Sequence, residues 1–319
     1  MAAPDIQIDS RLEDLAERPP LGVIAADLIR RQPLGAAGLF IVLAMIFMAV
    51  FADVLSSYDP EENAFESMHM APGLEHFLGT DQFGRDILSR IIHGARTALF
   101  VGFVSSFVGA TLGLVLGVAS AYFGGRFDLI FQRVMDIFMA FPLIILALAV
   151  VSILGTDIYY VIIAITIPFV PRCARVVRSN ALAIREIPYI DAARALGYSH
   201  TRIILHHMVP NVMAPYLIMI TAFVGQAILL EASLSYLGLG VQEPVPAWGL
   251  MLQGGAEEYA ESAPWIAVFP GLAITLAVFG FNLFGDALRD VLDPKLRWLL
   301  GFLVGLGRRR PAALTLARP

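Results

Sequence analysis

The chain is organised around a segment that is polar and helix-prone yet lies between apolar runs long enough to cross a bilayer, Tyr189-Ile190-Asp191-Ala192-Ala193-Arg194-Ala195-Leu196-Gly197. Pro188 is suited to open a helix here, since its ring pre-sets φ and its missing N–H would have no partner in the first turn. Gly197 is suited to end the helix, because glycine adopts the left-handed conformation that follows a last turn. Ala192 and Ala193 predict a helix face with almost no side chain.

This polar insert spans residues 179–210 and contains a second helix-prone run, Thr201 to Met208, which Pro210 stops or bends. A short helix with a bare alanine face, projecting from a membrane protein, is suited to dock a partner. An ordinary loop with a helical hairpin is an equal alternative on the residues alone.

The composition predicts an all-α polytopic membrane protein. The chain is 58% hydrophobic and 15% charged, with a mean hydropathy of +0.73. Soluble domains carry roughly a quarter charged residues and could not bury this excess of apolar side chains. Membrane lipid is therefore the expected surrounding of these apolar side chains. The net charge of −5 gives no support for a nucleic-acid partner. The single cysteine, Cys173, excludes an internal disulfide and a cysteine-rich metal site.

Six apolar segments predict six transmembrane helices, at residues 33–52, 97–125, 137–156, 158–171, 211–230 and 262–285. Phe141-Pro142 is expected to kink the third near its cytoplasmic end. The fourth is short, and we expect it to continue through Arg172, Arg175 and Arg178, whose side chains would snorkel to the inner interface. A re-entrant half-span is the alternative for this fourth segment.

The charge distribution predicts that both termini lie in the cytoplasm. Arg30 and Arg31 precede the first span, whereas acids outnumber arginines in residues 53–90, and arginine favours the cytoplasmic side. The expected division is a tail, a first transmembrane helix, an external segment, a five-helix core with the cytoplasmic insert 179–210, and a cytoplasmic or interfacial tail. These parts are residues 1–32, 33–55, 56–96, 97–293 and 294–319.

A stripe of small residues in the second span predicts close helix packing. Its members recur every four residues and so share one helix face: Ser105, Gly109, Gly113, Gly117 and Ala121. In the fifth span, Glu231 and nearby Ser233 are candidates for lining or gating a transport path, since a carboxylate at membrane depth is costly. The alternative is a carboxylate near the interface, bonded to a neighbouring helix.

The insert resembles the loop signature of ABC importer permeases. The signature is Glu-Ala-Ala, three residues, Gly, nine residues and Ile-x-Leu-Pro. This chain has Asp191-Ala192-Ala193, three residues, Gly197, nine residues and His207-Met208-Val209-Pro210, so that the alanine pair, the glycine and the proline fall in register. Asp191, His207 and Val209 depart from the pattern. His207 is similar to what the dipeptide and oligopeptide branch carries.

Three further strings are similar to the peptide branch of that family, so the resemblance covers about residues 79–293. They are Gly79-Thr80-Asp81-Gln82-Phe83-Gly84-Arg85-Asp86, the run from Glu231 to Gly240, and Gly285-Asp286-Ala287-Leu288-Arg289-Asp290. The resemblance implies a type I ABC importer permease fold in the inner membrane of a bacterium.

The resemblance implies a mechanism of alternating access and several partners. Two ATPase subunits would each grip a cytoplasmic helix of this kind, and in this chain the contact would involve Asp191, Ala192, Ala193, Gly197 and Pro210. A second, related permease would complete the membrane core, and an extracytoplasmic binding protein would deliver substrate. ATP and Mg²⁺ would be bound by the partner subunits.

The residues themselves predict neither a catalytic constellation nor a cofactor site in this chain. A phosphate-binding P-loop needs a lysine after its glycines, and the one lysine, Lys295, lies in Asp-Pro-Lys-Leu-Arg. A membrane enzyme is a weaker alternative, because adjacent His206 and His207 would point about 100° apart on a helix and not share a metal. An ion-driven secondary transporter is disfavoured by the lack of ionisable residues in the second, third and sixth spans.

The sequence leaves the substrate open. Peptides are favoured by the branch that the chain resembles, and nickel, glutathione or a peptide-like opine are the alternatives. His69 and His76, in the external segment, keep nickel under consideration.

Overall fold

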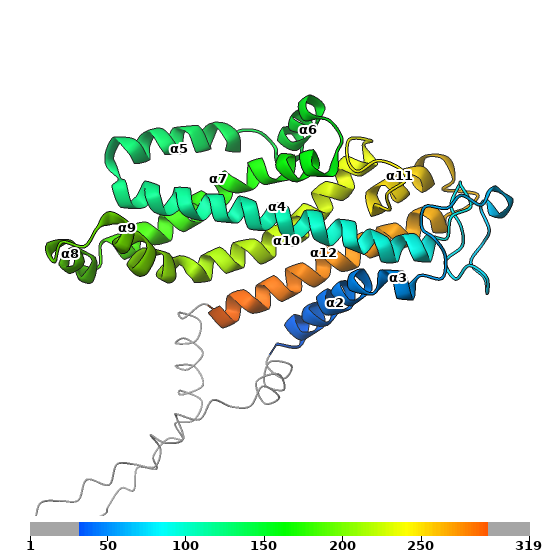
Figure 1. Cartoon of the computed structure of the whole chain (residues 1–319), viewed down its shortest axis with the longest axis horizontal. Helices are drawn as coiled ribbons and strands as arrows, with labels where there is room; N and C mark the ends of the chain where they lie inside the picture. Colours follow the sequence, from blue (N-terminus) through cyan, green and yellow to red (C-terminus); the bar gives the residue numbers. More distant parts are fainter. Residues whose placement is uncertain (1–31, 293–319) are drawn as a thin grey trace, which may run out of the picture.

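The long apolar runs of the sequence form long helices that lie side by side in one elongated bundle (Figure 1). The computed structural model describes residues 32–292. Five helices there are long and apolar enough to cross a membrane: α2 (Pro33–Val50), α4 (Ile87–Phe123), α7 (Ile158–Arg185), the run from His200 to Tyr236 that ends in α10 (Met213–Tyr236), and α12 (Trp265–Leu292). The prediction of an all-α, multi-span membrane protein is confirmed.

Shorter helices lie between these spans: α3 (Ala52–Leu55), α5 (Gly125–Met139), α6 (Leu143–Leu154), α8 (Pro188–Ala195) and α11 (Trp248–Glu258). The run that ends in α10 begins with the short helix α9 (His200–Ile203). A 3₁₀ turn, Phe65–Ser67, lies between α3 and α4. Within residues 32–292 the only β-type pairing is an isolated bridge between Thr80 and Asp86.

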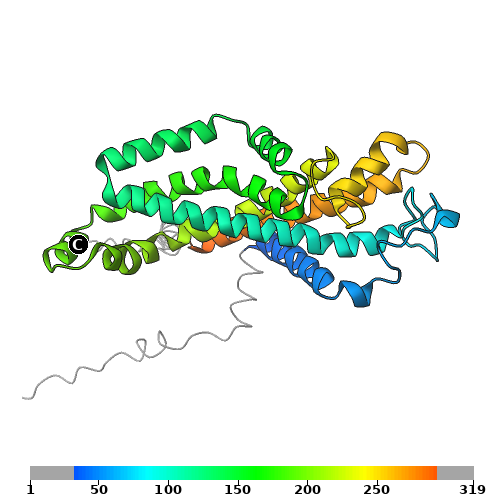
Figure 2. The ribbon, with the colours of Figure 1, turned by 45° about the horizontal axis from the view of Figure 1, so that its top comes forward.

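The two ends of the bundle carry different segments (Figures 1 and 2). Helices α8 and α9 lie at one end, and the segment 56–86 with α11 lies at the other. Helix α2 begins and α12 ends toward the α8 end, where Gln32 Nε2 donates to Asp290 Oδ2 at 3.3 Å. The expectations for tails 1–32 and 294–319 lie outside the described residues, apart from Gln32.

The third span differs from the predicted continuous helix at residues 137–156. Helix α5 ends at Met139, α6 starts at Leu143, and the two are bent by 87°. Pro142 supplies no N–H and disfavours helical geometry at Phe141, so the helix breaks rather than kinks. At 12 residues, α6 is roughly 18 Å long, too short to cross about 30 Å of hydrocarbon alone. Six crossings therefore result only when this bent pair counts as one.

The fourth span is a single helix of 28 residues, so the re-entrant alternative does not hold for it. Its arginines were expected to snorkel, but two of them bind the polar face of α5. Arg178 Nε donates to Asp128 at 2.6 Å, and Arg175 Nη2 lies 2.5 Å from Asp136. Helix α5, whose acids neutralise these arginines, was not predicted from the sequence.

The small-residue stripe of α4 lies against α7, as its spacing predicted for a packing face. A Cβ at Gly113 would lie 2.6 Å from Cys173 Cβ, and one at Gly117 would lie 2.6 Å from the carbonyl oxygen of Ala174. Gly109 meets Phe169 in the same way, and Ser105 Oγ donates to Ile162 O at 3.4 Å. Ala121 is fully buried at the end of the stripe. The backbones of α4 and α7 thus approach as closely as the missing side chains permit.

Candidate functional site

Helix α8 is fastened to the bundle by its inner face. Ile190 is fully buried and Ala193 is 5% exposed, and both belong to one apolar cluster with Ile203 and Met208. Pro188 occupies the first turn, as predicted. The inner face of α8 is therefore packed against the segment that carries Ile203 and Met208.

Gly197 ends α8 in the predicted left-handed conformation, with φ 78°. The N–H of Gly197 bonds to Arg194 O at 2.9 Å and that of Tyr198 to Ala193 O at 3.1 Å, which together form a Schellman motif. A Cβ at Gly197 would meet no atom of residues 32–292 within 4 Å. The position therefore faces open space.

The second helix-prone run of the insert does not stop at Pro210. Helix α9 widens into a π-helical turn at Ile204–Met208 and tightens to 3₁₀ at Val209–Val212, and α10 follows directly. Pro210 removes one backbone N–H, and these altered turns accommodate the loss. The carbonyl of His207 accepts instead from Asn211 Nδ2 at 2.7 Å and from the Tyr189 hydroxyl at 3.1 Å. The start of α8 is thereby bonded to the turns that precede α10.

A second set of contacts joins the insert to the end of α4. The Tyr122 hydroxyl lies 2.7 Å from His200 Nδ1, and the Arg194 guanidinium lies 5.4 Å from the centre of the Tyr122 ring. Arg185 Nη1 donates to the carbonyl of Ala121 at 2.9 Å. The insert is therefore bonded to the end of α4, and along the chain it continues α7 and leads into α10.

The outer face of α8 remains uncovered in this chain. Ala192 and Ala195 are exposed, Leu196 is 74% exposed, and Asp191 pairs with Arg194 at 3.0 Å. The structure thus separates two residues that the sequence grouped: Ala192 faces outward and Ala193 faces the bundle. We call Asp191, Ala192, Ala195, Leu196 and Gly197 the α8 surface.

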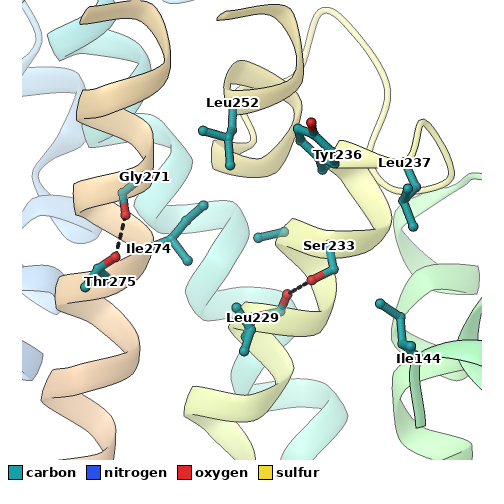
Figure 3. Close-up of a pocket in the computed structure, with 10 residues that line it drawn as sticks. Ile144, Leu229, Ser233, Tyr236, Leu237, Leu252, Gly271, Ile274 and Thr275 are labelled. Atoms are coloured by element: carbon teal, nitrogen blue, oxygen red, sulfur yellow. Dashed lines mark hydrogen bonds between the residues drawn. The ribbon is translucent and has the colours of Figure 1, made fainter. Parts of the chain in front are cut away.

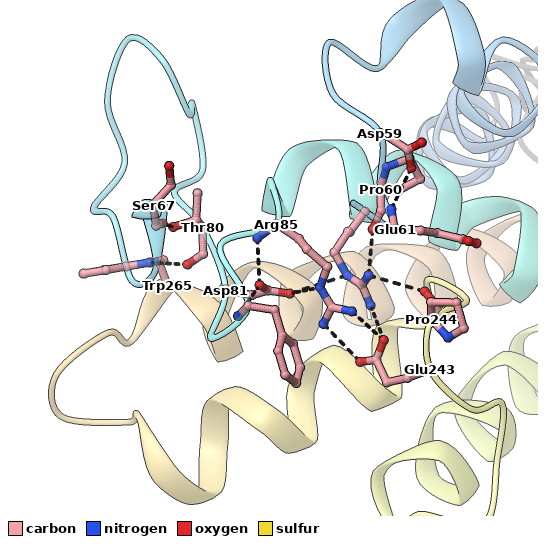
Figure 4. A network of polar contacts seen from close by, with 12 residues as sticks. Asp59, Pro60, Glu61, Ser67, Thr80, Asp81, Arg85, Glu243, Pro244 and Trp265 are labelled. Atoms are coloured by element: carbon pink, nitrogen blue, oxygen red, sulfur yellow. Dashed lines mark hydrogen bonds and ion pairs between the residues drawn. The ribbon is translucent and has the colours of Figure 1, made fainter. Parts of the chain in front are cut away.

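A polar network lies at the opposite end of the molecule (Figure 4). Asp81 Oδ1 accepts from the backbone N–H groups of Phe83 and Arg85, each at 2.9 Å, and its Oδ2 lies 2.7 Å from Arg85 Nε. Glu243 binds the same guanidinium, with 2.6 Å between Nη1 and Oε2. Fully buried Arg90 donates to Pro60 O at 2.7 Å. Burial lowers the pKa of Arg85, but the bonds to Glu243 and the charge of Asp81 outweigh this and raise it.

Sequence reasoning did not predict this network. Its signal was present, because arginine is disfavoured on the outer side of a membrane and Arg85 and Arg90 both lie in the segment assigned there. Two such arginines indicate acidic partners within the fold. The sequence could not identify Glu243 as one of these acids, because only the tertiary structure places it beside the start of α4.

A cavity of about 540 Å³ opens between α6, α10, α11 and α12 (Figure 3). Most of its walls are apolar, and Ser233 faces it with its hydroxyl donating to Leu229 O at 2.7 Å. Glu231 does not line it: this carboxylate is 1% exposed and accepts from Ser235 Oγ at 2.7 Å. The structure therefore separates the two residues that were paired as path candidates.

His69 and His76 each have a local partner. His76 Nδ1 lies 2.9 Å from Asp86, and the ring of His69 lies 4.3 Å from that of Tyr259. Within residues 32–292, no group of three or more His, Cys, Asp or Glu residues is arranged to hold a metal ion. His207 meets the rings of Tyr189 and Tyr198, while His206 is exposed.

Long apolar helices packed side by side in one bundle characterise a multi-span membrane protein. The chain belongs to the family of binding-protein-dependent transport system inner membrane components, whose model matches residues 109–298. Residues 25–72 match the N-terminal transmembrane domain of oligopeptide transport permease C. It is thus a multi-span permease component of the bacterial inner membrane, and the ion-driven alternative is not supported.

Curated relatives agree with this family. A putative peptide transport system permease of Brucella suis is 43% identical over 88% of this chain and 94% of its own length. The dipeptide permease DppC of Alkalihalophilus pseudofirmus is 44% identical over 84% and 88%. The glutathione permease GsiD of Pectobacterium atrosepticum is 40% identical over 90% and 95%.

The fold has a solved counterpart. The inward-facing MetNI methionine ABC transporter contains a chain that superposes with a TM-score of 0.52 at 20% identity. The match covers 65% of this chain and 98% of that one. At this identity the likeness concerns the fold, which is that of an ABC importer permease.

Proposed function

We propose that this chain is the membrane-spanning subunit of an ATP-driven importer of peptides. The observation that carries the proposal is the α8 surface, because it exposes the small residues Ala192, Ala195 and Gly197 on a helix that is held on both sides. Arg194 of α8 lies over the ring of Tyr122 in α4, and Tyr189 of α8 donates to His207 in the turn that leads into α10. A partner that grips α8 would therefore act on α4 and on the segment that continues into α10. The names of the relatives, which include peptide and dipeptide permeases, support peptides as substrate.

ATP and Mg²⁺ are bound by partner subunits in this proposal. The chain carries one lysine, Lys295, and it does not lie in a P-loop. Two ATPase subunits would supply the force, one of them acting through the α8 surface. Closure of the ATPases would push α8 toward the membrane and shift the bundle between two openings.

The membrane core is completed by a second, related permease. Many large apolar side chains of this chain are exposed, including Phe100, Phe103 and Phe107 on α4. Lipid and a second permease are the surroundings that suit such a surface. An extracytoplasmic binding protein would deliver substrate to the end that holds segment 56–86 and α11.

Within the same family, glutathione stands as the second substrate, since one relative is a glutathione permease of similar identity. Glutathione is itself a tripeptide, so both substrates share a small, flexible, charged backbone. Nickel and opines remain from the sequence comparison, and no observation on the described residues favours them.

The test is transport by the complete assembly, purified with its neighbouring subunits and reconstituted into liposomes. We expect peptide uptake that requires ATP and binding protein and that continues when a protonophore collapses the proton gradient. Uptake that stops with the proton gradient while ATP is maintained would refute the proposal. Glutathione offered in the same assay, with the cognate binding protein, decides between the two substrates.

A further inference from the structure

We infer that Arg172 and Gln226 form a site for the carboxylate of the substrate inside the membrane, an inference that rests on the proposed function. Arg172 Nη1 donates to Gln226 Oε1 at 3.2 Å. Both residues are half-buried. They join α7 to α10, away from the polar face of α5.

The depth of Arg172 makes its charge costly. It lies 14 residues after Ile158, the first residue of α7, which corresponds to about 21 Å along the helix. Gln226 lies ten residues before Tyr236, the last of α10, or about 15 Å. Both positions fall within a hydrocarbon core of about 30 Å. An ionisable residue at such depth normally faces protein partners or a water-filled path.

Arg172 differs from the other arginines of α7 in its partners. Arg175 and Arg178 are neutralised by Asp136 and Asp128, and Arg185 lies 3.9 Å from Glu186. Arg172 forms no ion pair with any residue between positions 32 and 292. Its one polar partner is a neutral amide, so its positive charge is available to an anion.

The position of Gln226 connects this charge to the cavity. Gln226, Leu229 and Ser233 are spaced by three and four residues, so they share one face of α10. Leu229 and Ser233 line the apolar cavity (Figure 3). The face thus leads from an apolar chamber, suited to peptide side chains, to a guanidinium about two turns deeper.

A carboxylate is the anion that this pair fits. A guanidinium binds carboxylates through two parallel N–H bonds, and the Gln226 amide adds a donor beside it. Every unmodified peptide ends in a carboxyl group that is ionised at neutral pH. The pair would therefore hold the C-terminus of a peptide while its side chains occupy the cavity.

The first experiment compares two substrates in the reconstituted complete transporter. One is a peptide with a free C-terminus and the other is the same peptide amidated, each supplied on saturating binding protein. Maximal uptake rates are measured for wild type and for Arg172→Gln. The preference of the binding protein cancels when the variant-to-wild-type ratio for one peptide is divided by that for the other.

We expect Arg172→Gln to slow uptake of the free-acid peptide by about tenfold or more, the cost of losing a charged hydrogen bond. Uptake of the amidated peptide should change less than about twofold on the same grounds. Arg175→Gln is the matched control, because it removes a cation one turn away that pairs with Asp136, and it should affect both peptides equally. Equal effects of Arg172→Gln on both peptides, or no effect, would mean that Arg172 pairs with another subunit or with lipid, and would overturn the inference.

A second experiment does not depend on the binding protein. Gln226→Cys is made in a Cys173→Ser background, since buried Cys173 is the one native thiol. An anionic methanethiosulfonate reagent should modify the new thiol faster than a cationic one, and Arg172→Gln should remove this preference. A thiol that reacts with neither reagent would overturn the inference. Absence of ATP-dependent uptake in wild type would refute the proposed function, whereas the labelling would still decide the inference.

Discussion

Arg85 and Glu243, 158 positions apart in the sequence, meet through two hydrogen bonds at the end of the bundle opposite α8. Nη1 lies 2.6 Å from Oε2, and Nη2 lies 3.1 Å from Oε1. The pair joins the start of α4 to the segment between α10 and α11. Arg90 reaches the same Glu243 at 3.4 Å and also donates to Pro60 O, so the two arginines and Glu243 together connect three segments.

Removal of Glu243 should loosen that end of the molecule. Glu243→Gln leaves two buried guanidinium groups with one carboxylate, Asp81, and we expect a loss of about 2–3 kcal/mol of unfolding free energy. Thermal unfolding in detergent, with limited proteolysis of residues 56–86, measures it. Arg133→Ala is the control, because Arg133 is 77% exposed and its ion pair with Asp136 is long, at 3.7 Å. Equal melting temperatures for the two variants would contradict this prediction.

The packing of α2 on α12 predicts a size exchange. A Cβ at Gly35 would overlap the Cβ of Ala287. Gly35→Ala should therefore cost about 1–3 kcal/mol, and adding Ala287→Gly should recover part of that loss. The melting temperatures of the two single variants and the double variant test this. A double variant no more stable than Gly35→Ala would show that the clash lies elsewhere.

The same exchange should fail between α4 and α7. At Gly117 the obstructing atoms are the backbone of Ala174, whose oxygen lies 2.6 Å from an added Cβ. Gly117→Ala should destabilise by about 1–3 kcal/mol, and Ala174→Gly should not restore it. Val115→Ala, on the exposed face of α4, is the control. Rescue by Ala174→Gly would be inconsistent with a backbone contact.

The two alanines of α8 should respond differently to bulk. Ala193 is buried, so Ala193→Phe should overpack the core and lower the free energy of unfolding by about 1–3 kcal/mol. Uptake should fall with it. Ala192 is exposed, so Ala192→Phe should leave the melting temperature of the isolated chain unchanged while uptake falls about tenfold or more, because the bulk displaces a partner. Co-purification with the ATPase subunit measures the contact directly. Full uptake by Ala192→Phe would exclude the α8 surface as the docking site.

Gly197 tests the same surface without changing an apolar contact. A Cβ there would lie more than 4 Å from the atoms of the neighbouring described residues, and Asn and Asp tolerate left-handed φ. We expect Gly197→Asp to abolish uptake while the protein still inserts at the normal level, and Gly197→Asn to separate bulk from charge. Normal uptake by Gly197→Asp would refute the coupling role of the insert.

Much of the architecture followed from local chemistry. Apolar length predicted the spans, and the four-residue repeat from Ser105 to Ala121 predicted a packing face, because both depend on helix period and bilayer thickness alone. Pro188 and Gly197 predicted the two ends of α8 for the same reason, since each restricts or permits its own backbone angles. The spacing of the loop signature carried the family.

Contacts between distant segments were decided by the tertiary structure. The partners of Arg175 and Arg178 could not be assigned until Pro142 was seen to break the helix and free α5 to lie along α7. Ala192 and Ala193 are the same residue type, so the sequence could not distinguish them. Ala193 is buried because it packs in one cluster with Ile203 and Met208, whereas Ala192 faces away from that cluster. Arg172 looked like one of three snorkelling arginines, and its difference arises because α10 and not α5 lies beside it. Local preferences act within a few residues, whereas burial and charge pairing depend on which helices are neighbours in space.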